Sequence, residues 1–218
     1  IEPVCEKISK AGGFSADSIV FHLSGALSSD ILSSAKASGA RTGSIHPLQA
    51  FAPYEPGQDS PFIGINMSIE GDEKAVALGK DIVKALQANP FTIPTDCKIL
   101  YHASAVVASN YLVTLENFAL ELLMKAKLSE KQAYDIIEPL IQGTLTNIKA
   151  RGSVDALTGP VARGDFEIVS SHIEGIGNQV PGFLKLYRLL GEYTLDITKQ
   201  RGEISKEACY RLSELFKN

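Results

Sequence analysis

The sequence is poor in cysteine, and no two of its three cysteines are close enough to form a CxxC motif. Cys5, Cys97 and Cys209 are odd in number and far apart along the chain. They therefore indicate reduced thiols, and they argue against a disulfide framework or a zinc site. Because reduced thiols are typical of the cytoplasm, we expect a cytoplasmic protein.

An excess of positive charge is also missing. Lysine and arginine number 21 against 25 aspartates and glutamates, which gives a formal net charge of −4. Without a basic stripe, nucleic acid is not an expected partner. The longest apolar stretch, "SAVVASNYLVTLENFAL", is interrupted by Ser109, Asn110, Glu116 and Asn117, so we expect no membrane span. We expect no signal peptide either.

Several motifs of known chemistry are absent from the sequence. It has no GxSxG elbow, no P-loop and no GxGxxG fingerprint. Its four histidines, His22, His46, His102 and His172, show no HxxxH or HxH spacing, and no carboxylate cluster accompanies them. We therefore expect no metal site.

Short apolar runs alternate with helical patterns over residues 1–94. The expected strands are 18–23, 40–46, 61–69 and 91–94, and the expected helices between them are 28–38 and 72–88. Strands that alternate with helices are typical of an α/β fold with a mainly parallel sheet. An amphipathic helix with Val4 and Ile8 on one face precedes them and begins abruptly at Ile1, so we expect a stretch upstream to be missing.

The pattern changes near Thr95, and no strand signal returns after it. Long helices are expected over 96–127, 129–150, 165–176, 180–200 and 205–216, with Ser129 and Ser205 as N-caps. The sequence thus predicts an α/β part over residues 1–94 followed by an all-helical domain over 95–218.

Polar residues follow two of the expected strands. "HLSGALSSD" places His22, Ser24 and Gly25 at the end of one strand, and His46 ends the next strand just before Pro47. In open parallel sheets, the crevice beyond the strands' carboxyl ends is the binding site. The alternatives are an ordinary turn with local capping at Ser24 and a His46 that bonds a carbonyl group.

The helix over residues 98–120 offers a second group of candidates. At 100° per residue, His102, Asn110 and three other polar residues share a sector of about 120°. His102 would be a general acid or base, and Asn110 would orient the substrate. The alternative is a buried helix whose polar groups bond neighbouring helices. Further along the chain, Arg163 could bind a carboxylate or phosphate as a planar fork.

Four segments in this order carry a resemblance: "HLSGALSSDIL", "GSIHPLQAF", "KILYHASAVVASNYLVTL" and "ALTGPVARGD…SSH". Together they resemble a family in which a Rossmann-like NADP oxidoreductase half joins a C-terminal domain of unknown function. That second domain is similar to the helical domain of 6-phosphogluconate dehydrogenase. The resemblance covers nearly the whole chain and extends more weakly to pyrroline-5-carboxylate and ketopantoate reductases.

The resemblance implies that family members carry one more βαβαβ unit upstream, with the glycine fingerprint that binds the pyrophosphate. This sequence also differs from related dehydrogenases at one position of the long helix. β-Hydroxyacid dehydrogenases place a catalytic lysine four residues before an asparagine on the long helix. If that asparagine corresponds to Asn110, the lysine position holds Val106. His102 and Lys98 stand one and two turns earlier and could substitute.

Our hypothesis is an oxidoreductase that uses NADP or NAD on a small carbonyl, hydroxy-acid or imine compound. His102 would be the acid or base, with Asn110 as its catalytic partner. His46, Ser24 and Arg163 would bind the substrate, and His22, Ser24 and Gly25 would contact the cofactor. The apolar content of the helical domain favours a homodimer. The alternatives are a non-catalytic dimeric binding or regulatory protein on the same scaffold, and a deazaflavin in place of the nicotinamide.

Overall fold

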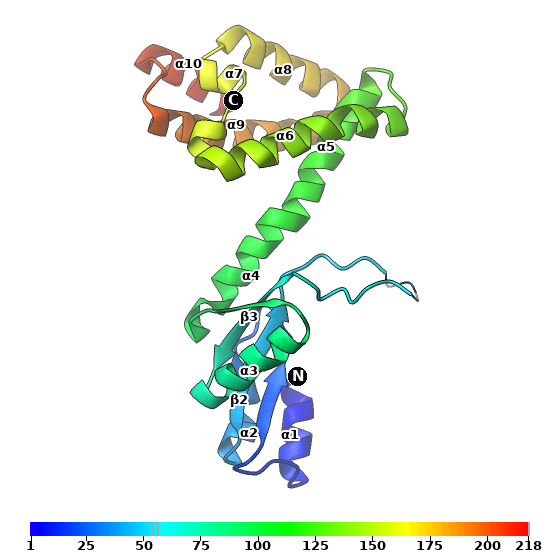
Figure 1. Ribbon diagram of the computed structural model, residues 1–218. Coiled ribbons are helices and arrows are strands. Elements are labelled where there is room, and N and C mark those ends of the chain that lie inside the picture. Colours follow the sequence, from blue (N-terminus) through cyan, green and yellow to red (C-terminus); the bar gives the residue numbers. More distant parts are fainter. Residues whose placement is uncertain (54, 56, 218) are drawn as a thin grey trace. The chain divides into compact units, whose positions relative to one another are not determined.

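The computed structural model describes residues 1–53, 55 and 57–217 of the chain (Figure 1). The chain divides into two compact units, Ile1–Val113 and Thr114–Asn218. The first unit contains every strand of the described chain, and the second is built from helices. The domain boundary that we predicted near Thr95 marks the end of the last strand, and the assignment of domains 1–94 and 95–218 stays a prediction.

The first unit is built on a four-stranded sheet in the order β1-β2-β3-β4. Its strands are β1 (Ile19–His22), β2 (Arg41–Pro47), β3 (Asn66–Gly71) and β4 (Asn89–Thr92). The pairs β1–β2 and β3–β4 are parallel, whereas β2–β3 is antiparallel. The expected α/β class with a mainly parallel sheet is therefore confirmed, followed by a helical part.

The antiparallel pair differs from the βαβ repetition that we expected throughout. Helices connect β1 to β2 and β3 to β4, but among the described residues of 48–65, between β2 and β3, none is helical. Parallel neighbours usually need a crossover helix, and without one β3 runs antiparallel to β2. The third strand also begins later than predicted, at Asn66, because the apolar residues before it form a turn.

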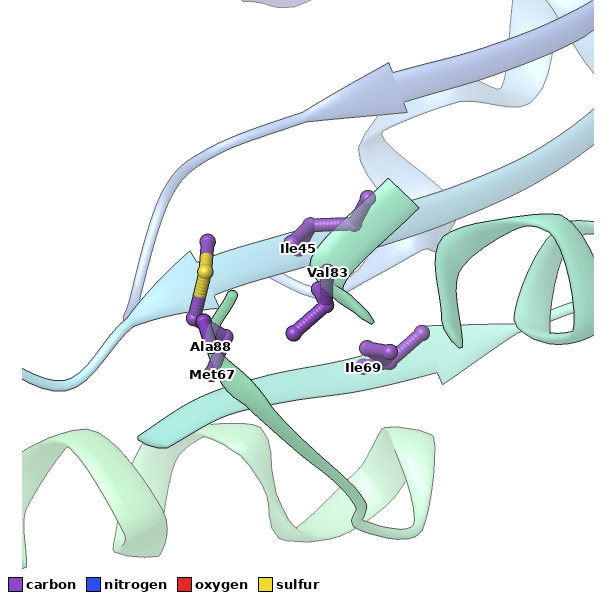
Figure 2. Close-up of a cluster of buried hydrophobic side chains, with 5 residues drawn as sticks. All are labelled: Ile45, Met67, Ile69, Val83 and Ala88. Carbon is purple, nitrogen blue, oxygen red and sulfur yellow. The ribbon is translucent and has the colours of Figure 1, made fainter. Parts of the chain in front are cut away.

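Helix α3 (Glu73–Ala85) covers one face of the sheet and forms its main core (Figure 1). Ile45, Met67, Ile69, Val83 and Ala88 are buried together there, as Figure 2 shows. Burial of one such aliphatic side chain contributes about 1.5–3 kcal/mol. This apolar layer fixes the positions of β2 and β3.

A second cluster joins α1 (Glu2–Lys10) to the segment formed by the 3-10 turn η1 (Ser29–Leu32) and α2 (Ser33–Ala37). The buried member of α1 is Cys5, whereas Val4 and Ile8 are 60% and 40% exposed. The predicted helix is present, but the apolar face that we assigned to it does not enter this core.

The long helix that we expected over 96–127 has four parts. They are the 3-10 turn η2 (Thr95–Cys97), α4 (Lys98–Val106), a π-helical turn η3 (Val107–Tyr111) and α5 (Leu112–Lys125). The π-turn changes which side chains share a face. Val107 and Tyr111, the apolar residues at the two ends of this turn, are each 58% exposed.

The second unit consists of the rest of α5 and the helices that follow it. They are α6 (Glu130–Ala156), α7 (Pro160–Arg163), α8 (Phe166–Gln179), the 3-10 turn η4 (Pro181–Phe183), α9 (Leu184–Arg201) and α10 (Lys206–Lys217). Ser129 forms a capping box with Gln132, and Asp165 and Ser205 accept hydrogen bonds from the first turns of α8 and α10. Nowhere in the described chain is a helix both long and apolar enough to cross a membrane.

Candidate functional site

The two faces of β2 and β3 have opposite character. Ile45 and Ile69 face α3, whereas Ser44 and His46 alternate with Ile45 and lie on the other face. Register pairs Ser44 with Glu70 and His46 with Ser68, so the polar residues of both strands gather on one face. Helix α4 approaches these residues with Lys98 and Tyr101.

A buried chain of hydrogen bonds ties α4 to the sheet. The Lys98 Nζ lies 2.6 Å from Ser44 Oγ, which lies 2.6 Å from Glu70 Oε1. Glu70 also accepts hydrogen bonds from the Ser29 backbone N–H and hydroxyl, each at 2.8 Å. Because the carboxylate accepts three hydrogen bonds, Ser44 donates to Glu70 and accepts from Lys98.

Lys98 and Glu70 are each 2% exposed, so a cation and a carboxylate are both buried. Burial lowers the pKa of Lys98, and the nearby Glu70 carboxylate acts in the opposite direction. Removal of Glu70 would leave Lys98 buried without its counter-charge, which is costly. These hydrogen bonds thus hold the start of α4 against β2.

One turn further along α4, two aromatic residues meet His46. The His46 Nδ1 lies 2.9 Å from Tyr101 Oη, and the His46 ring stacks on His102 with centroids 6.1 Å apart and 23° between the planes. Burial lowers the pKa of His46, with further contributions from Lys98 and His102, and burial raises the pKa of Tyr101. Near neutral pH, His46 is therefore a neutral imidazole held by a protonated phenol.

The loop after β1 closes against the same histidine. A Cβ placed on Gly25 would lie 2.6 Å from His46 Nε2, so only glycine allows this approach without a shift. His22 shapes the loop: its Nδ1 accepts from the Ser24 N–H at 3.1 Å, and its Nε2 lies 3.0 Å from the Ser28 carbonyl oxygen. Burial lowers the pKa of His22, which agrees with a neutral ring that uses both nitrogens.

A hollow of about 440 Å³ lies beside this cluster, entirely within the first unit. Its lining comes from the end of β2 and the residues after it, and from α4 and the π-turn: His46, Leu48, Gln49, Ala50, His102, Ser104, Ala105, Val106, Ala108, Ser109 and Asn110. Single π-turns occur frequently at functional sites. The volume is large enough for a small organic ligand.

The structure brings together most of the residues that the sequence singled out. His46, His102 and Asn110 line the hollow, and Gly25 packs against His46. Ser24 accepts a hydrogen bond from the Leu27 N–H at 3.1 Å, within the loop that His22 shapes. Arg163 is the exception, because it ends α7 in the second unit. The roles that we assigned to all of these residues stay predictions.

Sequence reasoning missed Ser44, Glu70 and Tyr101, and considered Lys98 only as a substitute for a family lysine. One signal was available. Ser44 and His46 are two apart on a strand, and Lys98 and His102 are four apart on a helix, so each pair shares a face. Nothing in the sequence indicated that the two faces meet.

No group of three or more His, Cys, Asp or Glu side chains in the described part of the chain is arranged to hold a metal ion. The cluster can instead offer hydrogen bonds and a proton. His46 and Tyr101 are polarised donors or acceptors, and His102 lines the hollow as a candidate general acid or base.

Comparison with known proteins places these observations in a family. Residues 65–194 match a protein family described as a domain of unknown function, DUF2520. The crystal structure of TM1727 from Thermotoga maritima is similar at a TM-score of 0.70 and 28% identity, covering 91% of this chain and 75% of that protein. BF3122 from Bacteroides fragilis, which carries the provisional name NADP oxidoreductase, is similar at a TM-score of 0.71 and 21% identity, covering 90% and 73%. No curated protein sequence matches.

The likeness to BF3122 shows the fold. The predicted resemblance is thus confirmed for a Rossmann-like fold and for a domain of unknown function. The finer kinship with 6-phosphogluconate dehydrogenase and the other reductases stays a prediction.

Proposed function

The chain belongs to the DUF2520 family, and we propose that it is an oxidoreductase that uses NADP or NAD on a small carbonyl, hydroxy-acid or imine compound. One observation carries the proposal. Two stacked imidazoles, His46 and His102, border a hollow at the carboxyl end of β2, beside the loop that follows the parallel strand β1. This is the edge at which open α/β sheets bind their ligands.

The choice of cofactor rests on the scaffold and on the loop after β1. The similar structure BF3122 is named for NADP, which supports a nicotinamide dinucleotide here. Gly25 lets the loop's backbone approach closely, and a Cβ there would overlap His46. Ser24 and Gly25, in the loop that His22 holds, fit the nicotinamide end of such a cofactor. The sequence has no GxGxxG fingerprint, so we assign no residue to the pyrophosphate.

When bound, a reduced nicotinamide supplies a hydride to an electrophilic carbon. His102 gives a proton to the substrate oxygen or nitrogen as negative charge develops there, and it takes the proton back in the reverse direction. The neutral His46, held by Tyr101 at 2.9 Å, and the Asn110 amide orient the polar group of the substrate. Arg163 remains our candidate for an anionic group of the substrate.

We further infer that the protein works as a homodimer in the cytoplasm. The helical part, residues 95–218, would provide the interface. On α6, Ile136 and Leu140 lie one helical turn apart and are 57% and 68% exposed, which is typical of a surface that a second subunit covers.

The test is a variant of His102 in the natural full-length protein. We expect the wild type to oxidise NADPH or NADH with at least one member of a panel of small aldehydes, 2-keto acids and cyclic imines. His102→Ala lowers kcat by about 10²–10⁴-fold, which is the usual contribution of a positioned acid. Nucleotide affinity stays unchanged, and the exposed Lys80→Ala serves as control.

Two results would change this conclusion. Unchanged turnover in His102→Ala would remove His102 from the chemistry. A wild type that binds the nucleotide and turns over no member of the panel would favour the alternative function, a non-catalytic binding or regulatory protein. The presence of Val106 where related dehydrogenases carry lysine is the observation that favours this alternative.

A further inference from the structure

The second unit contains a hollow of its own, of about 530 Å³, which the proposed reaction does not use. It lies among α5, the residue after α5, α8 and α9. Its lining consists of Leu122, Lys125, Ala126, Ser171, His172, Gly175, Ile176, Gln179 and Tyr187. The volume is in the range of small-molecule sites.

The walls are mostly apolar, and a few polar groups converge on them. The His172 Nδ1 lies 2.9 Å from Tyr187 Oη, and the two rings meet edge to face. With Nδ1 engaged, Nε2 is the imidazole nitrogen that a ligand would meet. Burial raises the pKa of Tyr187, so the phenol stays protonated. An apolar pocket with a small number of placed polar groups is the usual composition of a ligand site.

The charges around the hollow have one sign. Lys125, in the last turn of α5, lines it beside the His172 imidazole. No aspartate or glutamate occurs among the described residues of the lining. A cation next to an apolar wall fits a ligand that carries a negative group on an apolar body.

Gly175 leaves part of this lining without a side chain. It lies inside α8, where glycine weakens a helix relative to alanine. A Cβ at this position would meet no atom within 4 Å, so packing does not require glycine here. A side chain at this position would instead enter the hollow, because Gly175 is part of the lining.

We propose that this hollow binds a small organic carboxylate with an apolar body. Lys125 and the His172 Nε2 bind the carboxylate, and Leu122, Ala126 and Ile176 contact the apolar part. The absence of a side chain at Gly175 leaves room for it. The site is separate from the hollow at the sheet edge, and its ligand does not depend on the nicotinamide cofactor.

The test uses calorimetric titration of the natural full-length protein with hexanoate and benzoate, compared with hexanol and benzyl alcohol. We expect saturable binding of at least one acid, with the matching alcohol about tenfold weaker or worse, since a charge-assisted bond is lost. Lys125→Gln weakens the acid about tenfold.

Gly175→Leu fills the hollow and abolishes binding of the acid. Because leucine is the better helix former, this variant folds, which circular dichroism confirms. The matched control is Gly143→Leu on α6, another helical glycine whose Cβ would meet nothing, and it binds the acid as the wild type does. Three results would overturn the proposal: no saturable binding of either acid, equal affinity for acid and alcohol, or undiminished binding in Gly175→Leu.

Discussion

Replacement of Glu70 by glutamine tests the buried chain that joins α4 to the sheet. Glutamine keeps the size of the side chain but removes the negative charge. The carboxylate accepts three hydrogen bonds at 2.6–2.8 Å, and an amide cannot accept all three in the same geometry. Lys98, 2% exposed, would then be a buried cation whose described partner is the Ser44 hydroxyl.

The magnitude follows from the desolvation of that cation. Removal of one partner of a buried ion pair costs about 3–5 kcal/mol. Here a serine hydroxyl separates the charges, so we expect the lower end, about 3 kcal/mol. Lys98→Met leaves Glu70 its three donors and costs about 1–2 kcal/mol. In the double variant no charge remains, and the cost is lower than the sum of the single costs by about 2 kcal/mol.

Native-state hydrogen exchange of the β2 and β3 amides measures these free energies for the first unit itself. Glu73→Gln, an exposed glutamate of the same unit, is the control, with an expected cost of about 0.5 kcal/mol. If the cost of the double variant equals the sum of the two single costs within about 0.5 kcal/mol, Glu70 and Lys98 do not interact, and the reasoning is refuted.

The pH dependence gives a second check. Burial lowers the pKa of Lys98 below the ordinary 10.5, so near that pH the unfolded chain binds more protons than the folded chain. Stability therefore rises with pH through that interval. Loss of Glu70 lowers this pKa further. The cost of Glu70→Gln is thus largest near neutral pH and becomes smaller as the pH approaches 10.5. A cost that is constant with pH would contradict the assigned role of Lys98.

Three further predictions concern other parts of the chain. Gly25→Ala costs about 1–3 kcal/mol in thermal unfolding, because its Cβ would lie 2.6 Å from His46 Nε2; an unchanged Tm would show that the loop does not pack on this ring. Burial lowers the pKa values of His46 and His22, so the unfolded chain binds more protons below about pH 6.5, and urea unfolding shows that stability decreases there as the pH is lowered. His46→Phe removes part of that slope, and an unchanged slope would contradict the assignment. Ser129→Ala removes the capping box with Gln132 and costs about 1 kcal/mol by urea unfolding, whereas an unchanged midpoint would show that the cap contributes nothing.

The part of the site that could be predicted depends on local rules. A histidine followed by proline marks the end of β2, and the carboxyl ends of parallel strands gather at one edge of a sheet. These rules were sufficient to expect His46 near the loop that contains Gly25. The helical spacing predicted that His102 and Asn110 share a face, and the structure brings both to the hollow, His102 from α4 and Asn110 from the π-turn.

The buried polar chain could not be predicted, because local patterns do not report what covers a face. Alternation of polar and apolar residues, as at Ser44 and Glu70, usually marks a strand with one face in water. Here η1 and α2 cover that face, and the Lys98 side chain reaches it from the start of α4, so the polar groups are buried and bond one another. The antiparallel direction of β3 depends on the connection before it, which carries no strong signal for a crossover.

The contact between Gly25 and His46 is another feature that local sequence patterns could not predict. The sequence indicated a tight turn after β1, for which glycine is an ordinary choice. The structure adds a contact between residues 21 positions apart in the sequence, since a Cβ at Gly25 would overlap the ring of His46. Such long-range contacts follow from tertiary packing and have no signature in a short segment.

The most direct test of the proposed function is calorimetric titration of NADPH and NADH into the natural full-length protein. We predict micromolar binding of one of the two nucleotides, and a shift of the His46 imidazole resonances on saturation because the cofactor lies beside this ring. A folded protein that binds neither nucleotide would contradict the proposed function and would favour a deazaflavin cofactor or a non-catalytic scaffold.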